Sequence, residues 1–68
     1  MIAITELSIE ARQIESSLIN RCMYYKRHHL AAFELGLTTI ASYHLERLAK
    51  AEKELKEFQE NNLGLLEL

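Results

Sequence analysis

Leu35-Gly36-Leu37-Thr38 interrupts a chain of 68 residues that has no proline and one other glycine. On both sides of this segment run long stretches with helical apolar spacing. Glycine readily takes the left-handed conformation that ends many helices, and a hydrophobic residue often follows it. The segment therefore predicts two helices joined by a short turn, with Gly36 in the left-handed position after the first helix. Leu37 is expected to pack back on the last turn, and Thr38 or Thr39 to cap the second helix.

The first helix is expected over about residues 5–35, with Thr5 or Ser8 as its N-cap. Its apolar residues repeat in alternating steps of three and four, which marks one face of a helix. This stripe, with Cys22 beside it, consists of Ile4, Leu7, Ala11, Ile14, Leu18 and Tyr25. A second apolar edge makes the arc wider than one partner helix requires. It consists of Ile19, Met23, Leu30 and Phe33.

The second helix is expected over about residues 39–60, after a turn at 36–38 and before a tail at 61–68. Its stripe consists of Ala41, His44, Leu48, Ala51, Leu55 and Phe58. A short loop makes two helices antiparallel neighbours. Pairing positions whose numbers sum to about 73 matches the two stripes, and the same sum leaves open whether the tail folds back on Leu7 and Ile4. The chain is thus predicted to be a single all-α domain, a two-helix antiparallel hairpin.

Association is expected because two helices cannot enclose a core. A chain of this length is near the lower limit for a stable core, and its single cysteine excludes an internal disulfide. We therefore predict a four-helix bundle formed by a homodimer, or a higher oligomer. The residues expected in the oligomer seam are Leu7, Ile14, Leu18, Tyr25, Leu48, Leu55 and Phe58.

Candidate chemistry is sparse. Cys22 has no base placed to activate it, and the sequence contains no nucleophile elbow, phosphate loop or zinc spacing. His28, His29 and His44 are expected near the turn, where a metal site or a pH sensor stays open as an alternative to a polar contact. We expect no enzyme activity, no cofactor and no small-molecule substrate. The absence of a signal peptide and of a long uncharged run predicts a cytoplasmic protein with no membrane partner.

Charge is distributed unevenly along the chain. Residues 20–50 carry a net charge of +3, whereas residues 1–19 carry −2 and residues 51–68 carry −3. The hairpin is therefore expected to have a basic turn end and an acidic open end. Such small chains without catalytic motifs are typical of accessory proteins of phages, plasmids or bacterial regulatory circuits. We predict a non-enzymatic protein-binding regulator, inhibitor or assembly factor. The residues expected to bind the partner are Ile19, Met23, Lys26, Arg27 and Leu30.

One alternative comes from the segment Leu30 to Leu45. Its alanine four residues before Gly36, its Leu-Gly-Leu-Thr turn and its Ile-then-His-Leu ending resemble a helix-turn-helix motif. In that motif the second helix enters the DNA major groove. The resemblance implies a compact DNA-binding transcriptional regulator, so nucleic acid is the second candidate partner. The residues that it would turn toward DNA are Thr38, Thr39, Ser42, Tyr43 and Arg47. Against this alternative, the net charge of −2 is not typical of nucleic-acid binders.

Overall fold

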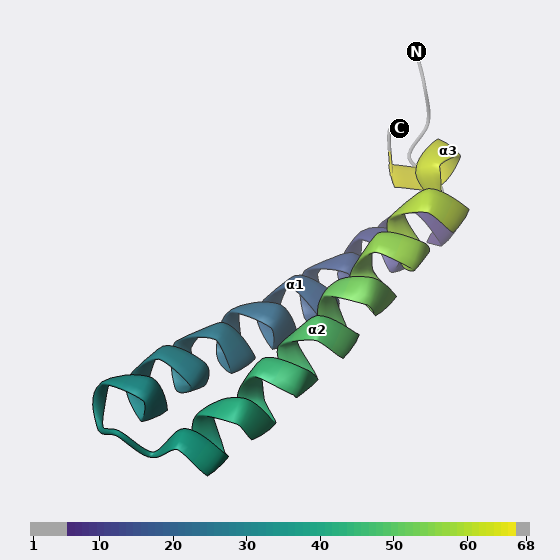
Figure 1. Ribbon diagram of the computed structural model, residues 1–68. Helices are drawn as coiled ribbons and strands as arrows, with labels where there is room; N and C mark the ends of the chain where they lie inside the picture. Colours follow the sequence, from purple (N-terminus) through teal and green to yellow (C-terminus); the bar gives the residue numbers. More distant parts are fainter. Residues whose placement is uncertain (1–5, 67–68) are drawn as a thin grey trace.

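The computed structural model describes residues 6–66. They form two long helices, α1 (Glu6–Glu34) and α2 (Thr38–Asn61), and one short helix, α3 (Leu63–Leu66). α1 and α2 run side by side in opposite directions, and α3 lies at the open end of the hairpin (Figure 1). The molecule is a rod of 53 × 16 × 13 Å, and residues 6–66 contain no strand. The all-α hairpin predicted from the sequence is therefore confirmed.

The turn between α1 and α2 is built around Gly36, whose φ is +74°. The Gly36 N–H donates to the carbonyl of Phe33 at 3.1 Å, and the Leu37 N–H donates to the carbonyl of Ala32 at 2.9 Å. These two bonds are the Schellman pattern, which satisfies carbonyls at the end of a helix. Gly36 thus occupies the left-handed position predicted for it, while Leu37 is 45% exposed.

The predicted caps are wrong where the structure describes them. α2 begins at Thr38, and its N-cap is Leu37, whose carbonyl accepts the Ala41 N–H at 2.8 Å. Leu37 has no polar side chain, and the N-terminus of α2 has no side-chain cap within the described residues. Ser8 cannot cap α1 because it is the third residue of that helix and is fully buried. Thr5, the other predicted cap, lies outside the described residues.

The two long helices meet along faces that we call the hairpin interface. Its α1 members recur in steps of three and four and are half-buried or buried: Ser8, Ala11, Glu15, Leu18, Cys22, Tyr25, His29 and Ala32. Its α2 members are Ala41, His44, Leu48, Ala51, Leu55 and Phe58. The α2 face is the one predicted from the sequence. Among residues 6–66 the buried apolar residues are all alanines, namely Ala11, Ala32, Ala41 and Ala51.

The α1 face differs from the predicted stripe in its first half. Leu7 and Ile14 are 64% and 50% exposed, whereas Ser8 and Glu15 face α2 in their place. Small residues let two helices approach closely, and Ser8 serves this purpose where leucine would hold the helices apart. Glu15 is tolerated because its carboxylate accepts a hydrogen bond from Gln59 Nε2 at 3.0 Å. Ile4, the first residue of the predicted stripe, lies outside the described residues.

Polar contacts between the helices agree with the predicted register. Arg21 pairs with Glu54 at 3.2 Å, and Glu15 bonds to Gln59, so the residue numbers sum to 75 and 74. The Arg21–Glu54 pair is solvent-exposed and contributes little stability, about 0–1 kcal/mol. The pair marks how α1 and α2 are aligned along their length.

The tail is partly helical and folds back. Asn62 ends α2 with both its backbone N–H and its side-chain Nδ2 donating to the Phe58 carbonyl, at 3.0 and 2.9 Å. The Asn62 carbonyl then accepts the N–H groups of Leu65 and Leu66 and so starts α3. α3 contacts both α1 and α2. The open end of the hairpin is therefore covered on one side.

Candidate protein-binding surface

Five of the eight large apolar side chains of α1 that the hairpin interface leaves exposed lie along one side of the helix. We call this face the docking stripe, and it consists of Ile9, Arg12, Ser16, Ile19, Met23, Lys26, Leu30 and Phe33. All eight residues are exposed, with Met23 at 54% and Phe33 at 68%. Each member directly follows a residue of the hairpin interface. Because successive residues of a helix are turned by about 100°, the docking stripe lies about 100° around α1 from α2.

The surface of the docking stripe has two hollows between its larger side chains. Two small residues, Ser16 and Ser17, create a shallow hollow in its N-terminal half, whose lining is completed by Ile9, Arg12, Gln13 and Asn20. A second hollow follows in the C-terminal half and is lined by Met23, Lys26, Arg27 and Leu30. Alternating bulky and small residues are what allow the side chains of another helix to interdigitate.

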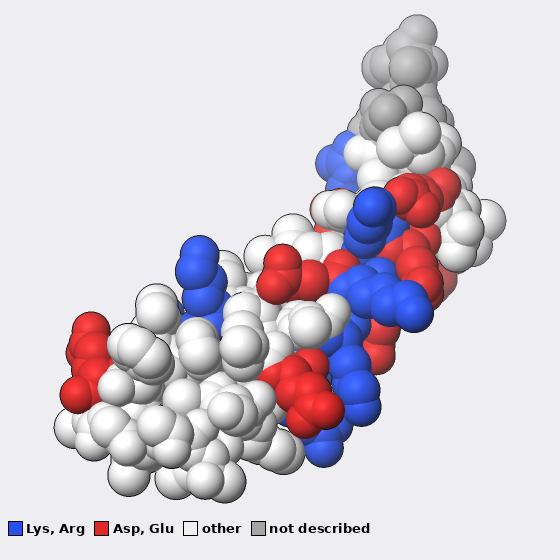
Figure 2. Space-filling view, in the orientation of Figure 1, with Lys and Arg blue, Asp and Glu red and all other residues white. Residues whose placement is uncertain are grey.

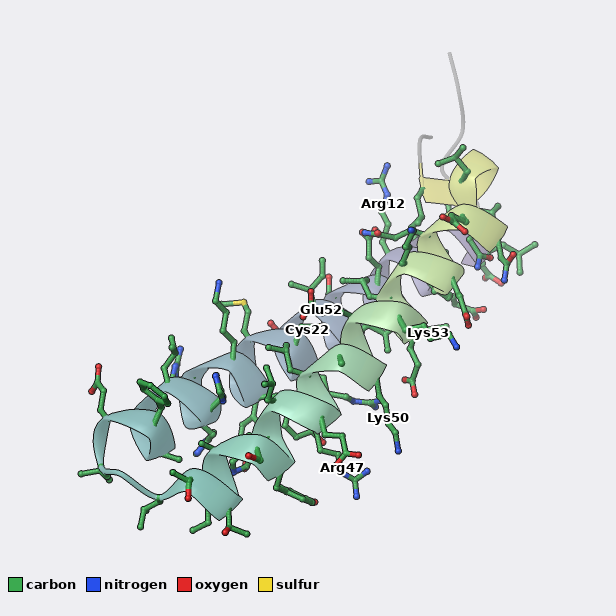
Figure 3. The ribbon with its side chains drawn as sticks, in the orientation of Figure 1. Arg12, Cys22, Arg47, Lys50, Glu52 and Lys53 are labelled. Carbon is green, nitrogen blue, oxygen red and sulfur yellow. The ribbon has the colours of Figure 1, made fainter. Side chains whose placement is uncertain are left out.

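A groove between the two long helices borders the docking stripe. It encloses about 280 Å³ and is lined by Cys22, Met23, Lys26, Leu48, Glu52 and Leu55. Cys22 of α1 and Glu52 of α2 lie across from one another near the middle of the hairpin (Figure 3). Met23 and Lys26 belong to both the docking stripe and the groove, so the two features form one continuous surface.

The residues predicted to bind a partner are brought together by the fold. Ile19, Met23, Lys26 and Leu30 lie on the docking stripe, and Arg27 lines the hollow beside it. Sequence reasoning placed Phe33 on the second apolar edge but missed Ile9, Arg12 and Ser16. The signal that could have found these three is the helical spacing of the second apolar edge, because steps of three and four back from Ile19 reach positions 16, 12 and 9.

The predicted oligomer seam is divided by the fold. Leu18, Tyr25, Leu48, Leu55 and Phe58 are half-buried between α1 and α2. The other two predicted members, Leu7 and Ile14, are exposed on the flank of the hairpin interface opposite to the docking stripe. Tyr24, which directly precedes the interface residue Tyr25 and is 54% exposed, lies on the same flank.

The end of the molecule around the turn is largely uncharged. It appears almost white in Figure 2, with the charged residues concentrated from the middle of the rod toward the open end. Residues 28–45 contain Glu34 as their one charged residue. Lys53 lies on the outer side of α2 (Figure 3), whereas Arg47 and Lys50 line a small hollow with Arg21 and Tyr25 of α1. The turn end itself is therefore not basic as predicted. The cations of residues 20–50 lie before residue 28 and after residue 45, nearer the middle of the rod.

The three histidines do not converge on one point. The His28 and His44 rings lie 5.4 Å apart, whereas the His29 Nδ1–H donates to the Ala41 carbonyl at 2.9 Å. His44 also contacts the rings of Tyr25 and Tyr43, and its buried Nδ1 finds no hydrogen-bond partner among the described residues. Within residues 6–66, no three His, Cys, Asp or Glu side chains are grouped to hold a metal ion. The histidines form part of an aromatic cluster near the turn.

Burial raises the pKa of the Cys22 thiol above its ordinary value. The carboxylates of Glu52 and Glu54 raise this pKa further, and Arg21 opposes them. The thiolate is the reactive form of cysteine, so a raised pKa makes the thiol less nucleophilic near neutral pH. This environment is the opposite of the one that activates a catalytic cysteine.

We expect Cys22 to be alkylated by iodoacetamide at pH 8 several-fold more slowly than a cysteine at the exposed position 20. The comparison uses the native chain and the double variant Cys22→Ser, Asn20→Cys, with alkylation followed by mass spectrometry. Raising the pH should increase the Cys22 rate over a higher range than that of the exposed cysteine. In urea the two rates should become equal. A Cys22 that reacts as fast as the exposed cysteine in the folded chain would contradict the shielding.

The geometry of the turn differs from that of a helix-turn-helix. That motif requires a steep crossing and a short second helix, whereas α2 has 24 residues and runs antiparallel beside α1 (Figure 1). The residues that the resemblance assigned to DNA all lie exposed in the first half of α2: Thr38, Thr39, Ser42, Tyr43 and Arg47. Arg47 packs over the Tyr43 ring, 5.2 Å from its centroid.

Comparison of the chain with models of protein families, with curated proteins and with solved structures finds no match. Among the helices of residues 6–66, none has the length and apolar character that crossing a membrane requires. The candidate site is thus chosen from the fold alone, and it is the docking stripe with the groove beside it.

Proposed function

We propose that this chain is a non-enzymatic protein-binding hairpin, acting as a small cytoplasmic regulator, inhibitor or assembly factor. Its docking stripe would pack against a helix of another polypeptide. The observation that supports this most directly is the exposure of Ile9, Ile19, Met23, Leu30 and Phe33 along one face of α1. Apolar faces of this extent on a small chain are typical of interaction sites.

The energetics of the hairpin support the same proposal. Within residues 6–66 its fully buried apolar residues are alanines, which contribute little hydrophobic free energy, while its larger apolar side chains are half-buried or exposed. Fully burying one large apolar side chain contributes about 1.5–3 kcal/mol. Covering the docking stripe therefore supplies several kcal/mol, and a partner that binds the folded hairpin stabilises it by mass action.

The shape of the surface specifies what kind of partner fits. The stripe positions recur in steps of three and four, and its five large apolar residues with the small Ser16 among them are complementary to the apolar face of a helix. The groove beside Met23 offers a further place for a side chain of that helix. An extended strand would instead need an exposed sheet edge, and residues 6–66 contain no strand.

The proposal predicts that Met23→Glu abolishes partner binding. The glutamate would place an unpaired charge in the middle of the contact, at a cost that weakens binding at least tenfold. The measurement is affinity capture from extracts of the source cell with the immobilised chain, followed by quantitative mass spectrometry. Circular dichroism verifies that the variant remains helical.

The matched control is Ala31→Glu. Ala31 is exposed on the same helix but outside the docking stripe, so this variant introduces the same charge elsewhere. A polypeptide that the native chain and Ala31→Glu retain, and that Met23→Glu loses, supports the proposal. Equal retention by Met23→Glu and Ala31→Glu would show that the docking stripe is not the binding surface.

A further inference from the structure

We infer that the docking stripe binds a second copy of this chain, with α1 packed against α1 in antiparallel orientation about a two-fold axis that crosses the stripe at the level of residue 21. This inference rests on the proposed function and names the occupant of the same surface. It predicts a definite register in addition to an oligomeric state.

The first argument is the angle between the two faces of α1. The docking stripe lies about 100° around α1 from the hairpin interface, because each of its members follows an interface residue by one. In a square four-helix bundle, each helix contacts two neighbours at about 90° to one another. α1 therefore has the two faces that a bundle of two hairpins needs, one for α2 and one for a second copy of α1.

The second argument is that the docking stripe is complementary to itself. In an antiparallel pair whose residue numbers sum to 42, Ile9 lies opposite Phe33 of the second copy, and Ile19 lies opposite Met23. The same register places the small Ser16 opposite the long Lys26. A shift by one heptad in either direction leaves the stripe residues at one end of α1 without a counterpart. The sum of 42 thus covers all five large apolar residues of the stripe.

The lengths of the helices agree with this register. α1 extends over Glu6–Glu34, so its midpoint is residue 20. An axis at the level of residue 21 makes the two copies of α1 overlap almost from end to end. The uncharged turn end of each hairpin then lies beside the open end of the other.

The third argument is charge complementarity. The middle of the sequence, residues 20–50, has an excess of cations, whereas residues 1–19 and 51–68 have an excess of acids. Because residues 28–45 hold one charged residue, an antiparallel pair places the acidic open end of each hairpin beside the largely uncharged turn end of the other, whereas a parallel pair would bring the two acidic ends together. Glu6 and Glu34 do meet as like charges at the exposed rims, where solvent limits the cost to less than about 1 kcal/mol.

The cations within the stripe are compatible with burial of its apolar members. Arg12 lies opposite Leu30 of the second copy, and Lys26 lies at the groove that Glu52 also lines. Long basic side chains bury their aliphatic stems and keep their charged ends in water. Arg12 and Lys26 therefore cover the edges of the contact.

The register can be tested with cysteines at three exposed positions beside the stripe. In a Cys22→Ser background, we introduce Gln13→Cys, Asn20→Cys or Arg27→Cys separately and treat each chain with bis-maleimidoethane. Facing positions on this flank have numbers that sum to 40, so Asn20→Cys should cross-link to itself. Gln13→Cys and Arg27→Cys alone should not, because each would lie about 21 Å from its counterpart along the helix. Mixed before refolding from urea, these two variants should cross-link to each other.

The outcomes distinguish an antiparallel pair from a parallel pair and from binding to another polypeptide. Cross-linking by Asn20→Cys and by the mixture, together with a dimer mass from light scattering that Met23→Glu reduces to a monomer, supports the inference. Self-cross-linking at all three positions would indicate a parallel pair and overturn it. A monomer mass without cross-links would also overturn it but would leave the proposed function standing if the capture experiment identifies a polypeptide that Met23→Glu loses. A dimer mass that Met23→Glu leaves unchanged would overturn it as well.

Discussion

Replacement of Ala32 by leucine is expected to lower the free energy of unfolding by about 1–3 kcal/mol. Ala32 is 5% exposed and faces α2 immediately before the turn, where α1 and α2 must be close enough for a short connection. A leucine at this position forces the helices apart or adopts a strained rotamer. The measurement is urea unfolding followed by circular dichroism at one fixed protein concentration, with the shift in midpoint converted at constant m-value.

The matched control for this prediction is Ala31→Leu. Ala31 is the preceding residue on the same helix and is exposed, so the substitution has the same effect on helix propensity without the steric conflict. Its free energy of unfolding should stay within about 0.5 kcal/mol of the native value. Equal losses in the two variants would mean that Ala32 is not packed between the helices.

The helices and the turn could be predicted because their signals are local. Gly36 is the one strong internal stop in a chain without proline, and its left-handed conformation follows from that position. The α2 face could also be predicted, since Leu48, Leu55 and Phe58 are its largest regularly spaced apolar residues and they do face α1.

The orientation of α1 about its own axis could not be predicted fully, because apolar residues are found on more than one side of this helix and a shift of one position changes which side faces α2. Sequence reasoning favoured the larger residues Leu7 and Ile14, whereas the structure turns Ser8 and Glu15 toward α2. That choice depends on contacts from elsewhere in the chain. Gln59 is 44 residues away from the carboxylate that it satisfies, and nothing near Glu15 indicates its presence.

Sequence reasoning found most of the apolar residues of the docking stripe but missed its polar residues in the N-terminal half. Ile19, Met23 and Leu30 carry a hydrophobic signal. Ser16 carries none, although its small size creates the hollow in the docking stripe. The short helix α3 was also beyond sequence reasoning, because it begins on hydrogen bonds to the Asn62 carbonyl, an acceptor that depends on where α2 ends.

Replacement of Gly36 by valine is expected to lower the free energy of unfolding by about 1–3 kcal/mol. The φ of Gly36 is +74°, a conformation that β-branched residues strongly disfavour. A Cβ built at this position has no atom within 4 Å, apart from its chain neighbours, so crowding does not contribute to the loss. The measurement is the same urea titration at fixed protein concentration. The loss in free energy of unfolding then reports the cost of holding valine at a positive φ.

Gly64→Ala is the matched control, because Gly64 also has free space around its Cβ but lies in α3 without a positive φ. Alanine there should leave stability unchanged or raise it by up to about 1 kcal/mol, since alanine restricts the unfolded chain and favours helix. Gly36→Asn should fall between the two, because asparagine tolerates the left-handed region better than valine. If Gly36→Val were as stable as the native chain, the Schellman turn could not be what joins the helices. The antiparallel register that aligns Arg21 with Glu54 would then need another cause.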